Sequence, residues 1–149
     1  MEAIAQALRA DDRRAVERAC NRLSQHLCAD LAVPSSPVKV LARRPADAGG
    51  ELHGLYVRDE EGRTLIRVWM RTAAHERVVA FRTFLRTVVH ELCHHFDFEH
   101  LQLAESFHTQ GFFQRESSLV HQLAGPTPGR RADAASPGGS RQLQLPGLG

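Results

Sequence analysis

One apolar stripe constrains the fold of this chain more than any other feature of its sequence. Between residues 75 and 98, large apolar side chains recur every three or four positions, which is the spacing of one helix face. They are Val78, Phe81, Phe84, Leu85, Val88, Val89, Leu92 and Phe96. A helix with such a face must bury it against a sheet or other helices. The stripe therefore predicts a helix from about His75 to Phe98 at the centre of a core.

The remaining segments predict the elements that pack around this helix. We expect N-terminal helices within residues 1–32 with an N-cap at Asp11 or Asp12, a short strand over Val38–Leu41, a hairpin over Leu52–Arg58 and Thr64–Arg71, and a C-terminal helix over Phe112–Leu123. In the second hairpin strand, Ile66, Val68 and Met70 share one face, which we expect to face the core. The pattern predicts an α+β fold with a short antiparallel sheet.

The length and the C-terminal composition suggest one domain followed by a tail. A chain of 149 residues is comfortable for a single core, and we assign that domain to residues 1–124. Residues 125–149 contain six glycines and four prolines without periodicity. Such a segment has too little apolar surface to offset the entropy of ordering, so we expect a disordered tail.

Composition excludes several classes of protein. Nineteen basic residues against seventeen acidic ones leave a net charge of +2, which gives no support for a nucleic-acid partner. No apolar run approaches the roughly 18 residues of a membrane span, and the first residues lack the basic and apolar regions of a signal peptide. The three cysteines form no CxxC pair, which argues against a disulfide framework and a zinc ribbon. We expect a cytoplasmic protein without membrane contact; its oligomeric state stays open.

The motif His90-Glu91-Leu92-Cys93-His94 carries the chemistry of the sequence, because it has the pattern H-E-x-x-H. Two histidines four residues apart on a helix lie on one face, where both imidazoles can bind one cation such as Zn²⁺. Glu91 lies at the edge of that site, where it can accept a proton from a metal-activated water. Since the apolar stripe is nearly opposite His90 and His94, the helix is expected to present both histidines on a polar side.

A catalytic zinc site needs a third protein ligand and one open position. His108 precedes the predicted C-terminal helix and is the favoured candidate. His100 has the spacing of metzincins, although Asp97 stands where that motif has glycine. Glu105 would be the third ligand of a gluzincin-like site, and it remains a further alternative.

With these residues, the sequence resembles the SprT-like zinc metallopeptidases, in particular a small bacterial branch without the C-terminal zinc ribbon. The resemblance covers about residues 50–123 and rests on a strand and helix leading into the H-E-x-x-H motif, a histidine fourteen residues later and a Gly-Phe pair beyond it. It implies a zincin-like fold, with His90, His94 and His108 as zinc ligands and Glu91 as catalytic base. Thr109 follows His108, where the family usually has glycine.

Two classes of function follow from the motif, since a third, a DNA-associated protease, would need a basic surface that the net charge of +2 does not indicate. The first is a zinc-dependent metallopeptidase that hydrolyses peptide or unfolded protein bound against an exposed edge strand, for which Thr64–Met70 is the candidate. The second is a non-catalytic, metal-stabilised protein-binding module. Glu91 discriminates between them, because a structural site has no use for an unligated carboxylate beside the metal. 

Several neighbouring residues have secondary roles in this interpretation. Asp97 is a candidate to support a metal-binding histidine through a hydrogen bond. Arg115 and Glu116 could orient a ligand or polarise a substrate, but a solvated helix face or a local ion pair is the favoured interpretation for them. We expect Tyr56, Trp69, Cys93 and His95 to serve packing and structure.

Overall fold

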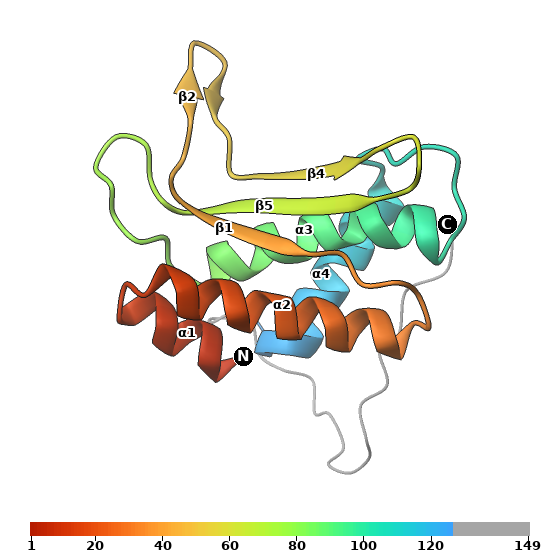
Figure 1. Ribbon diagram of the computed structural model, residues 1–149, viewed down its shortest axis with the longest axis horizontal. Coiled ribbons are helices and arrows are strands. Elements are labelled where there is room, and N and C mark those ends of the chain that lie inside the picture. The colour runs from red at the N-terminus through yellow and green to blue at the C-terminus, as the bar shows by residue number, and fades with distance from the viewer. Residues whose placement is uncertain (127–149) are drawn as a thin grey trace.

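The fold is built on a three-stranded sheet of order β1-β5-β4 in the computed structural model, which describes residues 1–126 (Figure 1). β1 (Val38–Arg43) runs parallel to β5 (Thr64–Arg71), whereas β4 (Gly54–Arg58) runs antiparallel to β5. A small hairpin of β2 (Ala46–Asp47) and β3 (Gly50–Glu51) projects from one end of the sheet. The α+β class is confirmed, and the main sheet is mixed rather than wholly antiparallel.

The central position of β5 corrects the choice of edge strand made from the sequence. β5 is hydrogen-bonded to β1 on one side and to β4 on the other, so it has no free edge. Its residues Ile66, Val68 and Met70 are fully buried, as expected, whereas Arg67 on the other face is exposed. The most apolar strand takes the centre because both its neighbours then shield it. β4 is consequently the edge strand on the side of the metal motif.

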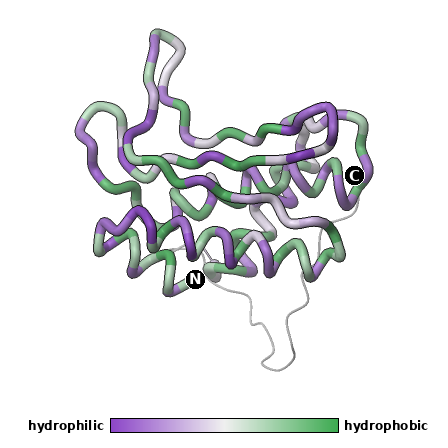
Figure 2. Tube along the Cα trace, viewed as in Figure 1, coloured by the Kyte–Doolittle hydropathy of each residue, from purple (hydrophilic) through white to green (hydrophobic). Residues whose placement is uncertain are grey.

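Two helices, α1 (Glu2–Arg9) and α2 (Arg13–Asp30), form the N-terminal region. The chain breaks between them at Asp11, whose φ of +54° lies in the left-handed region. Asp12 is the N-cap of α2, because its side chain accepts a hydrogen bond of 3.0 Å from the backbone N–H of Ala15. α2 packs on β1, and in Figure 2 hydrophobic and hydrophilic residues alternate along both helices. Of the two candidates for the N-cap, Asp11 and Asp12, the structure has Asp12.

The motif helix is α3 (Phe81–Glu99), which lies against β4 and β5. It begins at Phe81 rather than at His75, because the preceding segment continues the pairing of β5. Val78 forms a bridge with Arg71, and the N–H of Val79 donates to the carbonyl of Met70 over 2.8 Å. The apolar stripe is buried as expected, and Phe84, Leu85, Val88, Val89 and Leu92 are fully enclosed.

The last element is α4 (Gln110–Ala124), which packs against α3. Thr109 is its N-cap and accepts a hydrogen bond of 3.1 Å from the N–H of Phe112. α4 ends at Ala124, and its C-cap is Gly125, whose φ is +77°. Most of the predicted disordered tail, residues 127–149, lies outside the described residues.

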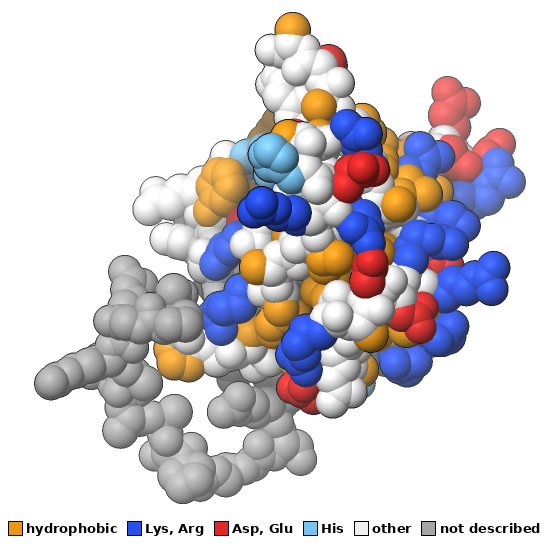
Figure 3. All heavy atoms as spheres, turned by 90° about the vertical axis from the view of Figure 1, so that its left-hand side faces the viewer, with side chains coloured by type: hydrophobic (Ala, Val, Ile, Leu, Met, Phe, Trp, Pro, Cys, Tyr) orange, Lys and Arg blue, Asp and Glu red, His pale blue; other side chains and the backbone are white. Residues whose placement is uncertain are grey.

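The described surface carries charges of both signs. On the face shown in Figure 3, Lys and Arg side chains are interspersed with Asp and Glu. Within residues 1–126, no helix has the length and hydropathy needed to cross a membrane.

Candidate metal centre

Three histidines meet beside the C-terminal half of α3. His90 and His94 point from successive turns of the helix, and His108 reaches them from the loop before α4. The Nε2 atom of His108 lies 3.0 Å from Nε2 of His90 and 3.0 Å from Nε2 of His94. One nitrogen from each ring falls within a group no wider than 4.8 Å, so these three histidines lie close enough to hold a metal ion.

The spacing of these nitrogens fits a small divalent cation. For Zn–N bonds of about 2.1 Å in tetrahedral geometry, two nitrogens stand about 3.4 Å apart. The observed separations of 3.0 Å would therefore change by only a few tenths of an ångström. Within the described residues, no fourth His, Cys, Asp or Glu joins the group. The arrangement is a three-nitrogen site with an open side.

Of the candidates for the third ligand, His108 joins the cluster, and His100 and Glu105 do not. The reason is the length of α3, which continues through Asp97 to Glu99 and leaves His100 as its C-cap. A metzincin-like return would need the chain to turn at residue 97. Here the left-handed residue is Gln102, with φ +55°, and the return comes later.

A hydrogen-bond relay fixes the ring of His94. Its Nδ1 lies 2.7 Å from Oγ of Ser106, and that hydroxyl donates its proton to Oδ2 of Asp97 over 2.6 Å. Because the only hydroxyl proton of Ser106 is used in this way, Ser106 must accept from Nδ1–H of His94. The lone pair of His94 is then on Nε2, which faces the other two histidines. Asp97 is thus linked to the candidate ligand His94 through Ser106 rather than by a direct hydrogen bond.

The same carboxylate anchors α4 through Arg115. Nη2 of Arg115 donates a hydrogen bond of 3.1 Å to Oδ1 of Asp97, and both side chains are almost fully buried. Asp97 therefore holds the loop between α3 and α4 through Ser106, and it holds α4 itself through Arg115. This ion pair fixes the segment that carries His108.

Glu116 has the corresponding place beside His90. Its Oε1 lies 3.8 Å from Nδ1 of His90 and 3.6 Å from Nη1 of Arg86. The carboxylate raises the pKa of His90 above its usual value, whereas burial opposes this shift. For His94, burial together with the charges of His90 and His108 lowers the pKa to about 4, so this ring is neutral at pH 7. A neutral ring is the form that binds a metal.

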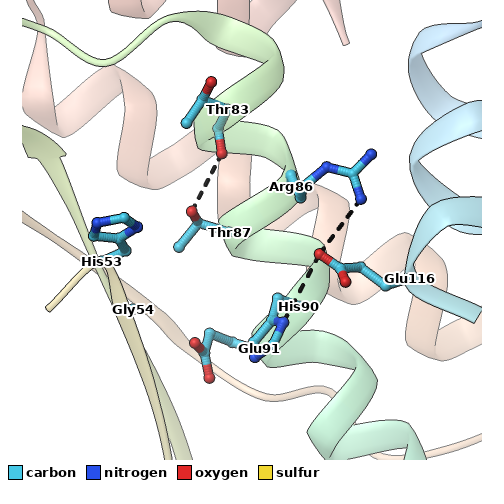
Figure 4. Close-up of a pocket in the computed structure, with 8 residues that line it drawn as sticks. All are labelled: His53, Gly54, Thr83, Arg86, Thr87, His90, Glu91 and Glu116. Atoms are coloured by element: carbon cyan, nitrogen blue, oxygen red, sulfur yellow. Dashed lines mark hydrogen bonds and ion pairs between the residues drawn. The ribbon is translucent and has the colours of Figure 1, made fainter. Parts of the chain in front are cut away.

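Glu91 lies beside the histidines without belonging to their cluster. Its side chain is buried, and this burial raises its pKa to about 7. Two cavities flank it, of about 340 and 400 Å³, and Gly54, His90 and Glu91 line both of them. Figure 4 shows the smaller cavity, in which Glu91 and Thr87 on α3 face His53 and Gly54 at the start of β4. The carboxylate is therefore placed in the middle of a cleft between α3 and β4.

Gly54 is a site residue that sequence reasoning missed. A Cβ atom at this position would lie 2.8 Å from Oε1 of Glu91 and 2.8 Å from Cγ2 of Thr87. Only glycine lets β4 approach α3 so closely. A glycine inside a strand pattern signals such an approach, so the sequence did carry a weak sign of it. Ser106 was also missed, and nothing in its local sequence marked it.

The four residues that we expected to serve packing are buried or partly buried in the structure. Cys93 and Trp69 are buried, and His95 is buried with its Nε2 2.7 Å from the carbonyl oxygen of Pro34. Tyr56 also lines the larger cavity, and its hydroxyl lies 2.9 Å from Nδ1 of His95. Tyr56 is therefore both a packing residue and part of the cleft wall.

Comparison with family models, with curated proteins and with solved structures finds no match for this chain.

Proposed function

We propose that the chain is a zinc-dependent metallopeptidase, similar to the SprT-like enzymes, with His90, His94 and His108 as zinc ligands. The observation that carries the proposal is the combination of an open three-histidine site with an unligated carboxylate, Glu91, in a cleft. Three imidazoles and an open position are the ligand set of catalytic zinc. A purely structural site closes its fourth position with another Cys or His.

The chemistry divides between the metal and the protein. Zinc held by the three histidines would lower the pKa of a water molecule toward about 7 and would polarise a substrate carbonyl. Glu91 accepts the proton of the water as its oxygen attacks the carbonyl carbon. It then donates that proton to the amide nitrogen as the C–N bond breaks. Glu116 and the Asp97–Ser106 pair keep the histidine rings oriented throughout.

Substrate binding is assigned to the free edge of β4. The N–H of Trp69 donates to the carbonyl of His53, so His53, Leu55 and Val57 direct their backbone groups toward β5. The backbone groups of Gly54 and Tyr56 then point to the open edge. An extended peptide can add to this edge as a further strand, which favours unfolded polypeptide as substrate.

The test combines metal content with one isosteric substitution. Purified protein is expected to contain about one zinc ion per chain and to hydrolyse casein. Glu91→Gln should keep the zinc and the fold, and should lower hydrolysis by about 10²- to 10⁴-fold. Glu105→Gln, a change at an exposed carboxylate outside the cluster, is the matched control and should retain full activity.

Two results would contradict the proposal. Cleavage by Glu91→Gln at the rate of the unchanged protein would show that Glu91 is not the base. A zinc-loaded protein that stays inert toward many unfolded substrates would instead favour the metal-stabilised binding module.

A further inference from the structure

The two cavities beside Glu91 differ in chemistry, and this difference bears on which peptide bond is cleaved. The larger cavity contains the three histidines of the candidate metal centre and extends from them toward the C-terminal end of α3, where Tyr56 and Phe98 line it. The smaller one extends toward the N-terminal half of the helix and is lined by Thr83 and Thr87. Both have volumes in the range typical of ligand-binding sites.

The larger cavity has a rigid aromatic wall. The ring of Tyr56 stacks on Phe98 with a centroid distance of 6.2 Å and an interplanar angle of 18°, and on His94 at 6.4 Å and 18°. The Tyr56 hydroxyl is held by His95, and the guanidinium of Arg58 lies 5.3 Å from the centre of the Phe98 ring. Aromatic surfaces of this kind favour a flat or bulky apolar side chain.

The smaller cavity has no Phe, Tyr or Trp in its wall, and apart from Gly54 all of its lining residues have polar side chains. Figure 4 shows Thr83 and Thr87 on one side and His53 on the other. The hydroxyl of Thr87 donates to the carbonyl of Thr83 over 3.2 Å. Arg86 lies next to Glu116, so its charge is largely compensated. This lining suits a polar, uncharged side chain.

The direction of β4 determines which substrate residue, the one before or the one after the cleaved bond, lies in each cavity. β4 runs from Gly54, which touches both cavities, toward Tyr56 in the aromatic one. A substrate strand that pairs antiparallel to β4, the slightly more stable arrangement, runs the opposite way. Its residue before the cleaved bond then lies in the aromatic cavity, and the residue after it lies in the polar cavity.

We infer that the chain cleaves unfolded polypeptide after an aromatic or other large apolar residue and before a polar uncharged one. This inference rests on the proposed peptidase function and names its substrate class.

Two peptides of identical composition test the order. One has Phe followed by Ser at its centre and the other has Ser followed by Phe, both within a background of Gln, Asn and Thr. Mass spectrometry is expected to show cleavage after Phe in both peptides, so that the cleaved bond moves by one residue between them. Cleavage before Phe, or a position independent of Phe, would overturn the inference. If casein is cleaved and neither peptide is, the inference fails while the proposed function stands; if casein is also untouched, the proposed function fails.

A binding measurement separates recognition from turnover. In the zinc-loaded Glu91→Gln variant, adding Phe98→Ala should weaken binding of the Phe-Ser peptide by about tenfold, measured by calorimetry. Binding of a matched peptide with Ser in place of Phe should stay unchanged. Phe98→Leu keeps apolar volume and should give an intermediate loss. Val57→Ala is the control, since Val57 is exposed and lines neither cavity. Equal losses for both peptides would contradict a role for Phe98 in selecting the apolar residue.

Discussion

The candidate metal centre joins two regions that are built in different ways. His90 and His94 come from one helix, and their convergence follows from the helical repeat alone. His108 comes from a loop, and its position depends on contacts of Asp97 with Ser106 and Arg115. The first region is therefore set by local geometry, and the second by packing between α3 and α4.

This difference teaches where the site is vulnerable. The helical pair keeps its geometry as long as α3 is folded and packed on the sheet. The position of His108 can change while both helices remain intact, because it depends on a buried ion pair and on one hydroxyl. Substitutions in the two regions should consequently separate metal affinity from stability.

Removal of a helical ligand should have the largest effect. His94→Ala is expected to lower zinc affinity by more than about 100-fold. Loss of a group that only orients a ligand costs about 10- to 100-fold, and loss of the ligand itself should cost more. His100→Ala is the matched control, since His100 lies outside the cluster. Zinc titration with a competing chelator measures both. Retention of full affinity in His94→Ala would contradict the assignment.

Breaking the buried ion pair should act mainly on stability. Arg115→Met leaves the Asp97 carboxylate without its buried partner, which typically costs about 3–5 kcal/mol. Urea unfolding of the variant should show this loss in the free energy of unfolding. Arg9→Ala, at an exposed pair with Glu2, should change the same quantity little. Equal losses in the two variants would show that the ion pair of Arg115 with Asp97 contributes no more to stability than an exposed pair does.

A methyl group at Gly54 should disturb Glu91 without touching the ligands. Since the added Cβ would lie 2.8 Å from Oε1 of Glu91, the carboxylate must move. We expect Gly54→Ala to lower casein hydrolysis by up to about 100-fold with zinc content unchanged. Val57→Ala on the exposed side of the same strand is the control. An unaltered rate in Gly54→Ala would show that the close approach of β4 is not needed.

Loss of the hydroxyl beside His94 should weaken the metal site more modestly. Ser106→Ala removes the acceptor for Nδ1–H of His94 and the donor to Asp97. Zinc affinity should fall by about 10- to 100-fold. Ser117→Ala, at an exposed position on α4, should leave the affinity unchanged. If both variants bind zinc equally well, the relay does not orient the ligand.

Substitutions at the two N-caps, Thr109 and Asp12, should have the smallest effects, and they compare a cap beside the metal centre with one far from it. Thr109→Ala and Asp12→Ala each remove one capping hydrogen bond and should each lower the free energy of unfolding by about 1 kcal/mol. Only Thr109→Ala should also weaken zinc binding, because Thr109 directly follows His108. A matching loss of zinc affinity in Asp12→Ala would point to global destabilisation instead.

The sequence by itself determined the features that repeat along the chain. The buried face of α3, the position of His90 and His94 on its other side, and the α+β class follow from spacings of two and 3.6 residues. The N-cap at Asp12 and the burial of one face of β5 also follow from the sequence, because residues close together in the chain decide them.

Only the tertiary structure decided what depends on residues far apart. β5 lies between β1 and β4, although the hairpin alone is compatible with β5 at an edge. Likewise, residues 75–80 leave the helical pattern because pairing with β5 competes for their backbone groups. His108, rather than His100 or Glu105, joins the histidines because α3 extends to Glu99 and Asp97 ties the return loop to α4. Such contacts carry no periodic signal, since their free energy comes from groups that only folding brings together.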